Sequence, residues 1–481
     1  MNITDPIRRH AEQSPDSIAI IGPNSSGITY REFDQTIDAV GRRVLDLELV
    51  PGNTVGVQDL KPYRFVIMTL ALARLGIASA PMSLAAELMD ACVAASNAAA
   101  SGMARLVTVD EIWAKGAPSS ADASPLPSHQ DGASVVRFFP SSGTTGLVKH
   151  VAITHDMIGR RVHSRELIAP LPDSATQIST IGVGSHYGFK SVVRVLWAGG
   201  QVVMPGKPEK VASLIERHHV NYLVVAPMTL QQIIALMPPG VGPFPSLQTI
   251  EFGGSMLPTR LYDLARSRLC PNIVSLYGTT ESGVIAAAPM SALVDHPGAI
   301  GYVHPSVEIQ AVDADDKPLP PGTEGILRVR SDTCVDAYVG DAAASAGAFK
   351  GGWFYIGDVG AVSGDGLLTL AGRTGELINI GGNKVSPGVI EDVLLSLAEI
   401  REAAAFGAPD ASGFTQIWAA IVPNGPVDVA TLKAICVERL KENAPRFIMR
   451  VKELPRNAAG KILRDKLTRM AIATQAALTS R

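Results

Sequence analysis

The sequence has few cysteines and almost no net charge. Its 481 residues include only Cys92, Cys270, Cys334 and Cys436, with no CxxC pair and no nearby histidines at zinc spacing. This excludes a disulfide-built miniprotein and predicts reduced, buried thiols. The balance of 42 Lys and Arg against 45 Asp and Glu leaves a net charge of -3. Such a balance gives no indication of a nucleic-acid partner or a polybasic membrane surface.

The chain also lacks a long uninterrupted apolar run. The most apolar stretch, 66–82, contains Arg74 and reaches Pro81 near its end, so it falls short of the ~20 apolar residues of a spanning helix. We expect a buried helix followed by a strand there. The N-terminal segment turns polar at once and has no apolar signal core. We therefore expect a cytoplasmic protein with no membrane span.

The pattern that is present predicts an α/β fold. Short β-branched runs alternate with amphipathic stretches such as 30–47 and 210–219, which favours a large N-terminal region of covered β-sheets. Between 297 and 372, strand-like runs separated by Asp, Gly and Pro turns predict hairpins or a small β-barrel-like part. The clearest strand candidates of the first part are 17–22, 54–60, 201–205, 221–227 and 249–254.

A glycine-rich segment around 373–386 is typical of a linker. We expect an N-terminal domain over 1–372 and a smaller, mobile α+β domain over 373–481, with the hinge near 373–376. Within the smaller domain the pattern indicates two helices, a strand and a polar tail. Those elements are expected at 387–398, 417–422 and 428–442.

The segment FFPSSGTTGLVKHV, 138–151, carries the strongest chemical signal. Glycines allow close backbone approach, hydroxyls add donors and a lysine adds positive charge, a combination that suits a polyphosphate. The spacing does not fit a Walker A loop, and by itself the segment could be an ordinary turn. The candidate residues are Ser141, Ser142, Gly143, Thr144, Thr145, Gly146 and Lys149.

Four further motifs follow this loop in the chain, and the series resembles the adenylate-forming superfamily, which includes acyl-CoA synthetases, adenylation domains and luciferases. The first, SSGTTGLVK, resembles the family's phosphate loop, and LYGTTESG its YGxTE element. WFYIGDVG resembles the aspartate motif, GRTGELINIGGNKVSPGVIE the hinge motif and LPRNAAGKILRDKL the C-terminal lysine motif. They begin at 141, 276, 353, 372 and 454.

The resemblance implies roles around the nucleotide. Tyr277 would stack on adenine, Thr280 would contact the α-phosphate region, and Glu281 would help to hold Mg²⁺, since a hard cation suits carboxylate and phosphate oxygens. Without the family, Tyr277 could equally pack in the core and Glu281 cap a helix. The remaining nucleotide-binding positions implied are Gly253, Gly254, Ser255, Gly278 and Thr279.

Three further residues receive roles from the same resemblance. Asp358 would accept hydrogen bonds from both ribose hydroxyls, and Arg373 would contact ribose and phosphate. Alone, Asp358 is typical of an Asx turn and Lys461 of a solvated charge. The resemblance instead implies that the small domain carries Lys461 into the site to stabilise charge at the α-phosphate.

The implied reaction has two halves. A carboxylate attacks the α-phosphate of ATP to give an acyl-adenylate and pyrophosphate, and a thiol then displaces AMP. In the family the small domain rotates between the halves. At the hinge this chain has Gly375 where Asp or Lys is usual, and glycine leaves rotation possible while defining the two poses less sharply.

The acid pocket departs most from the family pattern. His186 occupies the place of an aromatic or His gate, but its glycine follows after one residue instead of two, and His186 could equally be a packed histidine. No aspartate lies between Ser174 and Leu214, which argues against an α-amino acid substrate. Lys190 and Arg194, four residues apart, could pair with a second substrate carboxylate, although a solvated or internally paired basic pair explains them as well.

These observations predict an acid–CoA ligase that uses ATP, Mg²⁺ and coenzyme A. The alternatives are an adenylating enzyme that loads the phosphopantetheine of a separate acyl carrier protein, and a noncatalytic nucleotide-binding relative. The sequence does not separate aliphatic, aryl and dicarboxylic acids. It also leaves the oligomeric state open, with a homodimer the commonest closed form.

Overall fold

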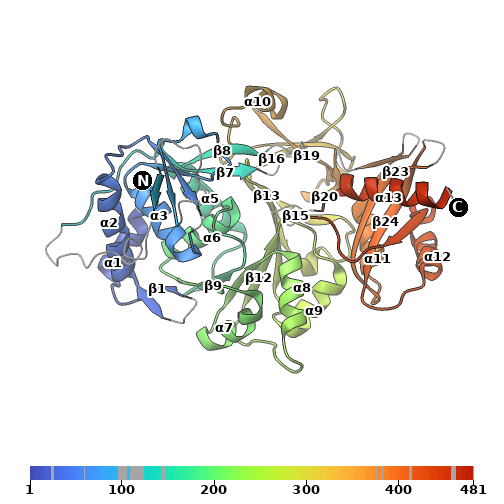
Figure 1. Cartoon of the computed structure of the whole chain (residues 1–481), viewed down its shortest axis with the longest axis horizontal. Coiled ribbons are helices and arrows are strands. Elements are labelled where there is room, and N and C mark those ends of the chain that lie inside the picture. The colour runs from blue at the N-terminus through green and yellow to red at the C-terminus, as the bar shows by residue number, and fades with distance from the viewer. Residues whose placement is uncertain are drawn as a thin grey trace.

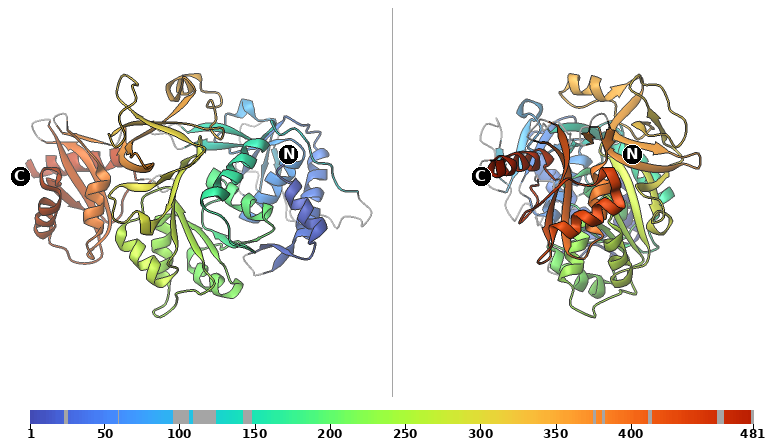
Figure 2. Two further views of the ribbon diagram at one scale, coloured as in Figure 1. Left: turned by 180° about the vertical axis from the view of Figure 1, so that it is seen from behind. Right: turned by 90° about the vertical axis from the view of Figure 1, so that its right-hand side faces the viewer.

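The computed structural model places the N-terminal part and the C-terminal domain at opposite ends of the long axis (Figure 1). The view from behind shows the same arrangement, and in the view along that axis the C-terminal domain lies in front of the N-terminal part (Figure 2). The structure describes residues 1–22, 26–58, 60–95, 106–108, 124–141, 148–374, 377–380, 383–410, 414–456 and 462–479.

A short sheet forms the core of the N-terminal end. Its strand order is β6-β5-β3-β4-β7-β8, parallel except for the β7–β8 pair. Helix α3 (Pro62–Arg74) connects β3 to β4, so the apolar stretch is a buried helix followed by a strand, as expected. The strands are β3 (Thr54–Gln58), β4 (Ala78–Ala80), β5 (Ala91–Ala94), β6 (Leu106–Thr108), β7 (Val135–Ser141) and β8 (Lys149–Thr154).

A longer sheet runs through the middle of the molecule. Its order is β16-β17-β19-β20-β15-β14-β13-β12-β11-β9-β10-β1-β2, with β18 on β19. Neighbouring strands from β13 to β1 are parallel to each other. The other neighbouring strands of this sheet are antiparallel. The strands are β1 (Ile18–Ile21), β2 (Gly27–Thr29), β9 (Thr176–Ser179), β10 (Gln201–Val203), β11 (Tyr222–Val225), β12 (Thr249–Gly253), β13 (Ile273–Thr279), β14 (Gly283–Pro289), β15 (Ala299–Val303), β16 (Glu308–Val312), β17 (Gly325–Arg330), β18 (Phe349–Lys350), β19 (Trp353–Val362) and β20 (Leu367–Arg373).

Helices fill the space between the sheets and cover the outer face. Helices α5 (His155–Ile168) and α6 (His186–Trp197) contribute to one hydrophobic core together with both sheets, and Figure 1 shows them between the sheets. A second core packs α7, α8 and α9 on the long sheet. The other helices here are α1 (Asp5–Gln13), α2 (Tyr30–Leu45), α7 (Val211–His218), α8 (Pro227–Leu236), α9 (Thr259–Arg268) and α10 (Ala342–Ala348), with 3₁₀ turns at Ala86–Leu88, Pro208–Lys210 and Met290–Ala292.

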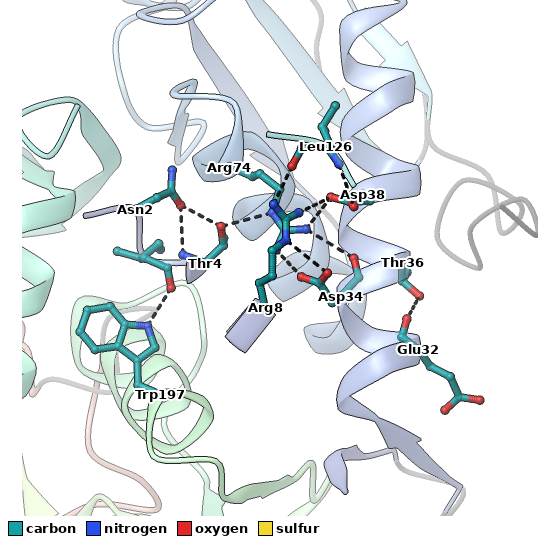
Figure 3. Close-up of polar contacts among 11 residues, drawn as sticks. Asn2, Thr4, Arg8, Glu32, Asp34, Thr36, Asp38, Arg74, Leu126 and Trp197 are labelled. Carbon is teal, nitrogen blue, oxygen red and sulfur yellow. Dashed lines mark hydrogen bonds and ion pairs between the residues drawn. The ribbon is translucent and has the colours of Figure 1, made fainter. Parts of the chain in front are cut away.

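A buried polar network fastens the N-terminal segment to this core (Figure 3). The guanidinium of Arg74 on α3 is fully buried and donates to Asp34 at 2.5 Å and to Asp38 at 2.6 Å, both on α2. Trp197, the last residue of α6, donates its indole N–H to the carbonyl of Ile3 at 2.7 Å. Helix α6 is thereby anchored at its C-terminal end, which leaves its N-terminal end to face the candidate site.

The C-terminal domain is a three-stranded sheet with helices on both faces. Alternate residues of β23 and β24 pack against α11 and α12 on one side and α13 on the other, the period of two that a covered strand requires. The elements are β21 (Ile378–Ile380), β22 (Asn383–Val385), α11 (Pro387–Leu395), β23 (Ile400–Pro409), β24 (Thr415–Pro423), α12 (Val429–Leu440), a 3₁₀ turn (Lys441–Asn443), β25 (Phe447–Arg450) and α13 (Arg464–Thr479).

The last segment of the chain is not the polar tail that the sequence predicted. It contains β25, which pairs in parallel with β24, and α13, a helix of 16 residues. Only a sparse apolar set, including Leu467 and Ala471, meets the sheet, so the amphipathic pattern of α13 is weak. No helix among the described residues is both long and apolar enough to cross a membrane. The four cysteines form no disulfide.

Candidate active site

The carboxylate of Glu281 lies beside the flanks of the phosphate loop. Ser141, the last residue of β7, donates its hydroxyl to Glu281 Oε1, and Tyr338 donates to the same oxygen at 2.9 Å. The Lys149 amine lies 4.9 Å from the centre of the Tyr338 ring. Glu281 is buried, so the predicted Mg²⁺ ligand already sits among hydroxyl oxygens and near a cation. Ser142 to Gly146 lie outside the described residues.

A second group of polar side chains links β13 to β19 and β20 by hydrogen bonds. Tyr277 donates its phenol to Asp358 Oδ2 at 2.5 Å, and Arg373 Nε donates to Oδ1 at 2.7 Å. Asp358 and Arg373 are direct cross-strand partners, which is why residues fifteen apart in sequence meet. Burial and then the Asp358 charge raise the pKa of Tyr277 well above its usual value, so the phenol keeps its proton.

The turn after β13 depends on a glycine. A Cβ added at Gly278 would lie 2.1 Å from the carbonyl oxygen of Gly283, so the two strands approach too closely for any side chain. Thr279 accepts from the backbone N–H of Ser282 at 3.1 Å and closes the turn. This geometry directs Tyr277 toward Asp358 and Glu281 toward Ser141, and it places Thr280 between them in the chain.

The predicted adenine-side loop follows β12. Gly253 is the register partner of Leu276 on the neighbouring parallel strand β13, so the carboxyl ends of these strands meet at one sheet edge. Gly254 has a φ of +89°, the left-handed region that glycine readily adopts, and Ser255 is exposed. Ligands of open α/β sheets bind at this edge.

Arg161 on α5 organises the site, and it belongs to none of the motifs recognised in the sequence. Its fully buried guanidinium donates to the carbonyls of Thr280 at 2.9 Å, of Glu281 at 2.8 Å and of Thr333 at 2.7 Å. It also donates to Nε2 of His186 at 2.9 Å. Burial lowers the pKa of Arg161 to about 10, so it stays charged at neutral pH and holds the YGTTE turn against α5 and α6.

His186 begins α6 and faces the site. Its ring meets Phe139 of β7 edge-on, with the ring centroids 5.3 Å apart. Burial, together with the charges of Arg161 and Lys190, lowers the pKa of His186 well below its usual value. The imidazole is therefore neutral, and its Nε2 accepts a hydrogen bond because a guanidinium can only donate. His186 is buried in a fixed orientation, which the sequence had left open.

The unusual one-residue spacing from His186 to Gly188 has a local cause. The Ser185 hydroxyl caps α6 by accepting from the N–H of Gly188 and donates in turn to the carbonyl of Gly182. A Cβ at Gly188 would lie 2.2 Å from that carbonyl oxygen. A glycine is therefore required at this position if the loop is to meet the helix so closely.

Glu251 on β12 is a buried anion that sequence reasoning missed. It accepts from Arg165 on α5, from Tyr187 at 2.5 Å and from Tyr222 at 2.7 Å. Burial by itself would raise its pKa, but the charges of Arg165 and its other partners hold the pKa of Glu251 at about 2. Its only sequence signal is a lone acid in the apolar run TIEFGG.

Lys190 and Arg194, four residues apart on α6, differ in their partners. Arg194 is fully buried and donates to the carboxylate of Glu166 and to the carbonyl of Ala169, so it follows the internally paired alternative that the sequence left open. Lys190 is 2% exposed. Among the described residues, none forms a hydrogen bond or ion pair with its amine.

Like Ser142 to Gly146, the predicted functional residues Lys461 and Gly375 lie outside the described residues. Within the described part of the chain, no three His, Cys, Asp or Glu side chains cluster as a metal site. A magnesium ion would thus be shared between Glu281 and oxygens of a bound nucleotide and water, as is usual for this cation.

Comparison with known proteins matches both parts of the chain. Residues 7–339 match the family model described as AMP-binding enzyme, and residues 389–461 match that of the AMP-binding enzyme C-terminal domain. A curated relative, the salicylyl-CoA synthase / salicylate adenylyltransferase of Streptomyces sp., is 27% identical, with 95% of this chain and 91% of the relative covered. The oxalate–CoA ligase of Arabidopsis thaliana is 26% identical over 94% of this chain and 95% of its own.

A solved structure has the same fold. The o-succinylbenzoate CoA synthetase of Bacillus subtilis, in complex with its acyl-adenylate intermediate, superposes with a TM-score of 0.84 at 22% identity, covering 96% of this chain and 97% of the other. The architecture of a sheet-rich N-terminal part and a smaller α+β domain is thus a known one.

Proposed function

The chain belongs to the AMP-binding enzyme family, and from this premise we propose that it is an ATP-dependent acid–thiol ligase. It activates a carboxylic acid as an acyl-adenylate and transfers the acyl group to coenzyme A. The curated relatives are named as ligases of this kind, including those for salicylate and oxalate. They act on different acids, so the substrate has to be sought in this chain's own residues.

The observation that carries this proposal is the convergence of segments from both sheets beside the turn after β13. Ser141 ends β7 of the short sheet and donates to Glu281 of that turn, while Tyr277 of β13 donates to Asp358 of β19 in the long sheet. Hydroxyls, carboxylates and nearby cations in one place suit a nucleotide with its magnesium ion.

Each group has a distinct task in the proposed reaction. Asp358 offers acceptors to the ribose diol, and Tyr277 and Arg373 hold its carboxylate in place. Glu281 supplies the oxygen ligand for Mg²⁺, whose charge when bound offsets that of the phosphates. The loop from Ser141 to Lys149, with Thr280, borders the phosphates, and Gly253 to Ser255 border the adenine.

The reaction itself is two displacements. A carboxylate oxygen attacks the α-phosphorus, the bond to the β-phosphate oxygen breaks, and pyrophosphate leaves. The sulfur of a thiol then attacks the acyl carbon and AMP leaves. Lys461 stabilises the charge that develops at phosphorus, and rotation of 373–481 near Gly375 exchanges the two chemistries at one site.

Exchange of labelled pyrophosphate into ATP tests the first half. We expect Lys461→Ala to lower the exchange rate by about 100-fold or more, the scale for losing one group that stabilises transition-state charge. The matched control is Lys466→Ala, an exposed lysine of the same motif, which should leave the rate unchanged. Full exchange in Lys461→Ala would contradict the proposed role, and no exchange in wild type with any acid would favour a noncatalytic relative.

The acceptor thiol is tested separately. Coenzyme A and a carrier protein present the same phosphopantetheine arm, so the enzyme is supplied with ATP, an accepted acid and free CoA. We expect an acyl-CoA thioester with release of AMP. Pyrophosphate release without a thioester would instead support loading of a separate carrier protein.

We also propose the cytoplasm as the compartment, because the four cysteines remain thiols. A homodimer is the oligomer to test by light scattering.

A further inference from the structure

Lys190 carries a buried amine for which the described part of the protein supplies no partner. It lies on α6 one turn after His186, and its side chain is 2% exposed. No described residue forms a hydrogen bond or an ion pair with the amine. Burying an amine without a partner lowers the stability of the fold. Lys190 therefore has no structural role that explains its position.

The surroundings of Lys190 contain more positive than negative charge. Arg161, Arg165 and Arg194 lie near enough for their charges to act on the amine, whereas Glu251 is the acid that does so. The oxygens of Glu251 are already engaged by Arg165 and by tyrosine hydroxyls. Burial, followed by the charges of Arg165 and Arg161, lowers the pKa of Lys190 well below its usual value.

The buried arginines nearby differ from Lys190 because each has acceptors. Arg161 donates to backbone carbonyls and to His186, and Arg194 donates to Glu166 and to Ala169. Their charges are used to hold the structure. An amine that serves no such purpose, one helical turn from a residue facing the active site, is available to a ligand.

We infer that the Lys190 amine binds a second acidic group on the carboxylic acid substrate. This inference rests on the proposed ligase function and narrows its substrate to acids with two anionic groups. A bound anion would offset both the burial and the surrounding positive charge. Because a helix rises about 1.5 Å per residue, Lys190 lies about 6 Å further along α6 than His186. The second group is therefore separated from the reacting carboxylate by a short chain or a ring.

Matched pairs of acids provide the test. Pyrophosphate exchange is measured with glutarate against pentanoate and with isophthalate against benzoate, in wild type, Lys190→Met and the control Lys210→Met, an exposed lysine outside the site. In wild type and in the control we expect the better diacid to exceed its monoacid in kcat/KM by about tenfold or more, the scale of one charge-assisted bond. In Lys190→Met the ratio should fall to about one.

Thermal unfolding of the same variants gives an independent readout. Methionine keeps roughly the length of the side chain and removes the unpaired amine, so Lys190→Met should unfold at the wild-type temperature or above it. A clear loss of stability would show that the amine has a structural partner and would overturn the inference. So would monoacids used as well as their diacids in wild type. Exchange with no acid at all would instead overturn the ligase function on which this inference rests.

Discussion

Several arginine side chains of this protein are fully buried. Arg74, Arg137, Arg161, Arg165 and Arg194 are among its largest fully buried side chains. A buried guanidinium is tolerated only where its N–H groups meet acceptors. Arg74 and Arg165 meet carboxylates, whereas Arg161 meets mainly carbonyls.

Arg137 is buried mainly against aromatic rings instead of carboxylates or carbonyls. Its guanidinium lies 4.7 Å from the ring centre of Phe65 and 5.4 Å from that of Phe139, and it donates to Ser79 at 3.1 Å. Burial lowers the pKa of Arg137 to about 9. Arg137 and Phe139 share one face of β7, so this cation supports the ring that orients His186.

Removing the charge of Glu251 tests the buried network at this scale. Glu251→Gln leaves Arg165 buried without its anion and removes one of the two carboxylates beside Arg194, and we expect a loss of about 3 to 5 kcal/mol in unfolding free energy, measured by denaturant titration. The control is Glu308→Gln, which breaks an ion pair that is half exposed with Arg330 and should cost no more than about 1 kcal/mol.

The difference in unfolding free energy between wild type and Glu251→Gln should depend on pH, and the pKa of Glu251 sets how. Its folded value of about 2 lies below the ordinary 4.5, so its carboxylate stabilises the fold above about pH 4.5. This contribution disappears as the pH falls toward 2. The gap between wild type and Glu251→Gln should therefore narrow over that window, and a constant gap would contradict the charge as its cause.

At the scale of elements, the start of α6 is the part most dependent on local geometry. The helix begins where Ser185 caps it, and the loop before it touches the first turn at Gly188. The periodicity of the sequence predicted neither this helix nor its start. The helix packs against two sheets and α5 at once, so all of its residues except Tyr187 and Trp197 are at least nine-tenths buried, the polar ones included.

Gly188→Ala tests whether this contact positions the site. The new methyl group would meet the carbonyl of Gly182, so the helix start must shift, and we expect a loss of about 1 to 3 kcal/mol in stability. Substrate KM should rise as well because His186 and Tyr187 move with the turn. The control is Gly184→Ala in the same loop, where an added Cβ meets nothing within 4 Å. Equal behaviour of the two variants would exclude the contact as the cause.

Other elements were predictable because one physical feature governs each. The strands β1, β3, β10, β11 and β12 are short β-branched runs, and all lie where the sequence predicted them. Strand β25 and helix α13 were missed because they have few apolar residues, which form no clear pattern in the sequence. These residues are buried only when β25 pairs with β24 and α13 packs on the sheet.

At the scale of the whole molecule, β20 is the last strand along the chain to join the long sheet, and it ends at Arg373. The described strands after it form separate sheets. The C-terminal domain nevertheless contacts the N-terminal part. Gln231 on α8 donates to the carbonyl of Arg401 and Arg260 on α9 to that of Ala398, both at 3.4 Å. These are long, exposed hydrogen bonds, so they are weak enough to break during the proposed rotation.

A cross-link across this contact tests that rotation. Gln231→Cys with Arg401→Cys, joined by a short thiol-reactive linker, should hold the two parts in the observed pose. Each half-reaction is proposed to need its own arrangement of the two parts. We therefore expect the rate of at least one half-reaction to fall by about tenfold or more, and the two rates to change by different factors. Pyrophosphate exchange and thioester formation from supplied acyl-adenylate measure them separately. Single-cysteine variants given the same reagent are the control, and two undiminished rates would contradict the rotation.

The sequence by itself determined the family, the α/β class and the candidate residues of the proposed nucleotide site, because glycine turns, hydroxyls and carboxylates at fixed spacings are local chemistry. The tertiary structure alone decided which charges are engaged. Arg194 and Lys190 share a helix and a spacing, yet one meets Glu166 and the other meets no described partner. Arg161 and Glu251 likewise acquire their roles only when α5 packs against β12 and the YGTTE turn. The partners of a buried charge come from distant segments, and no spacing within one segment records them.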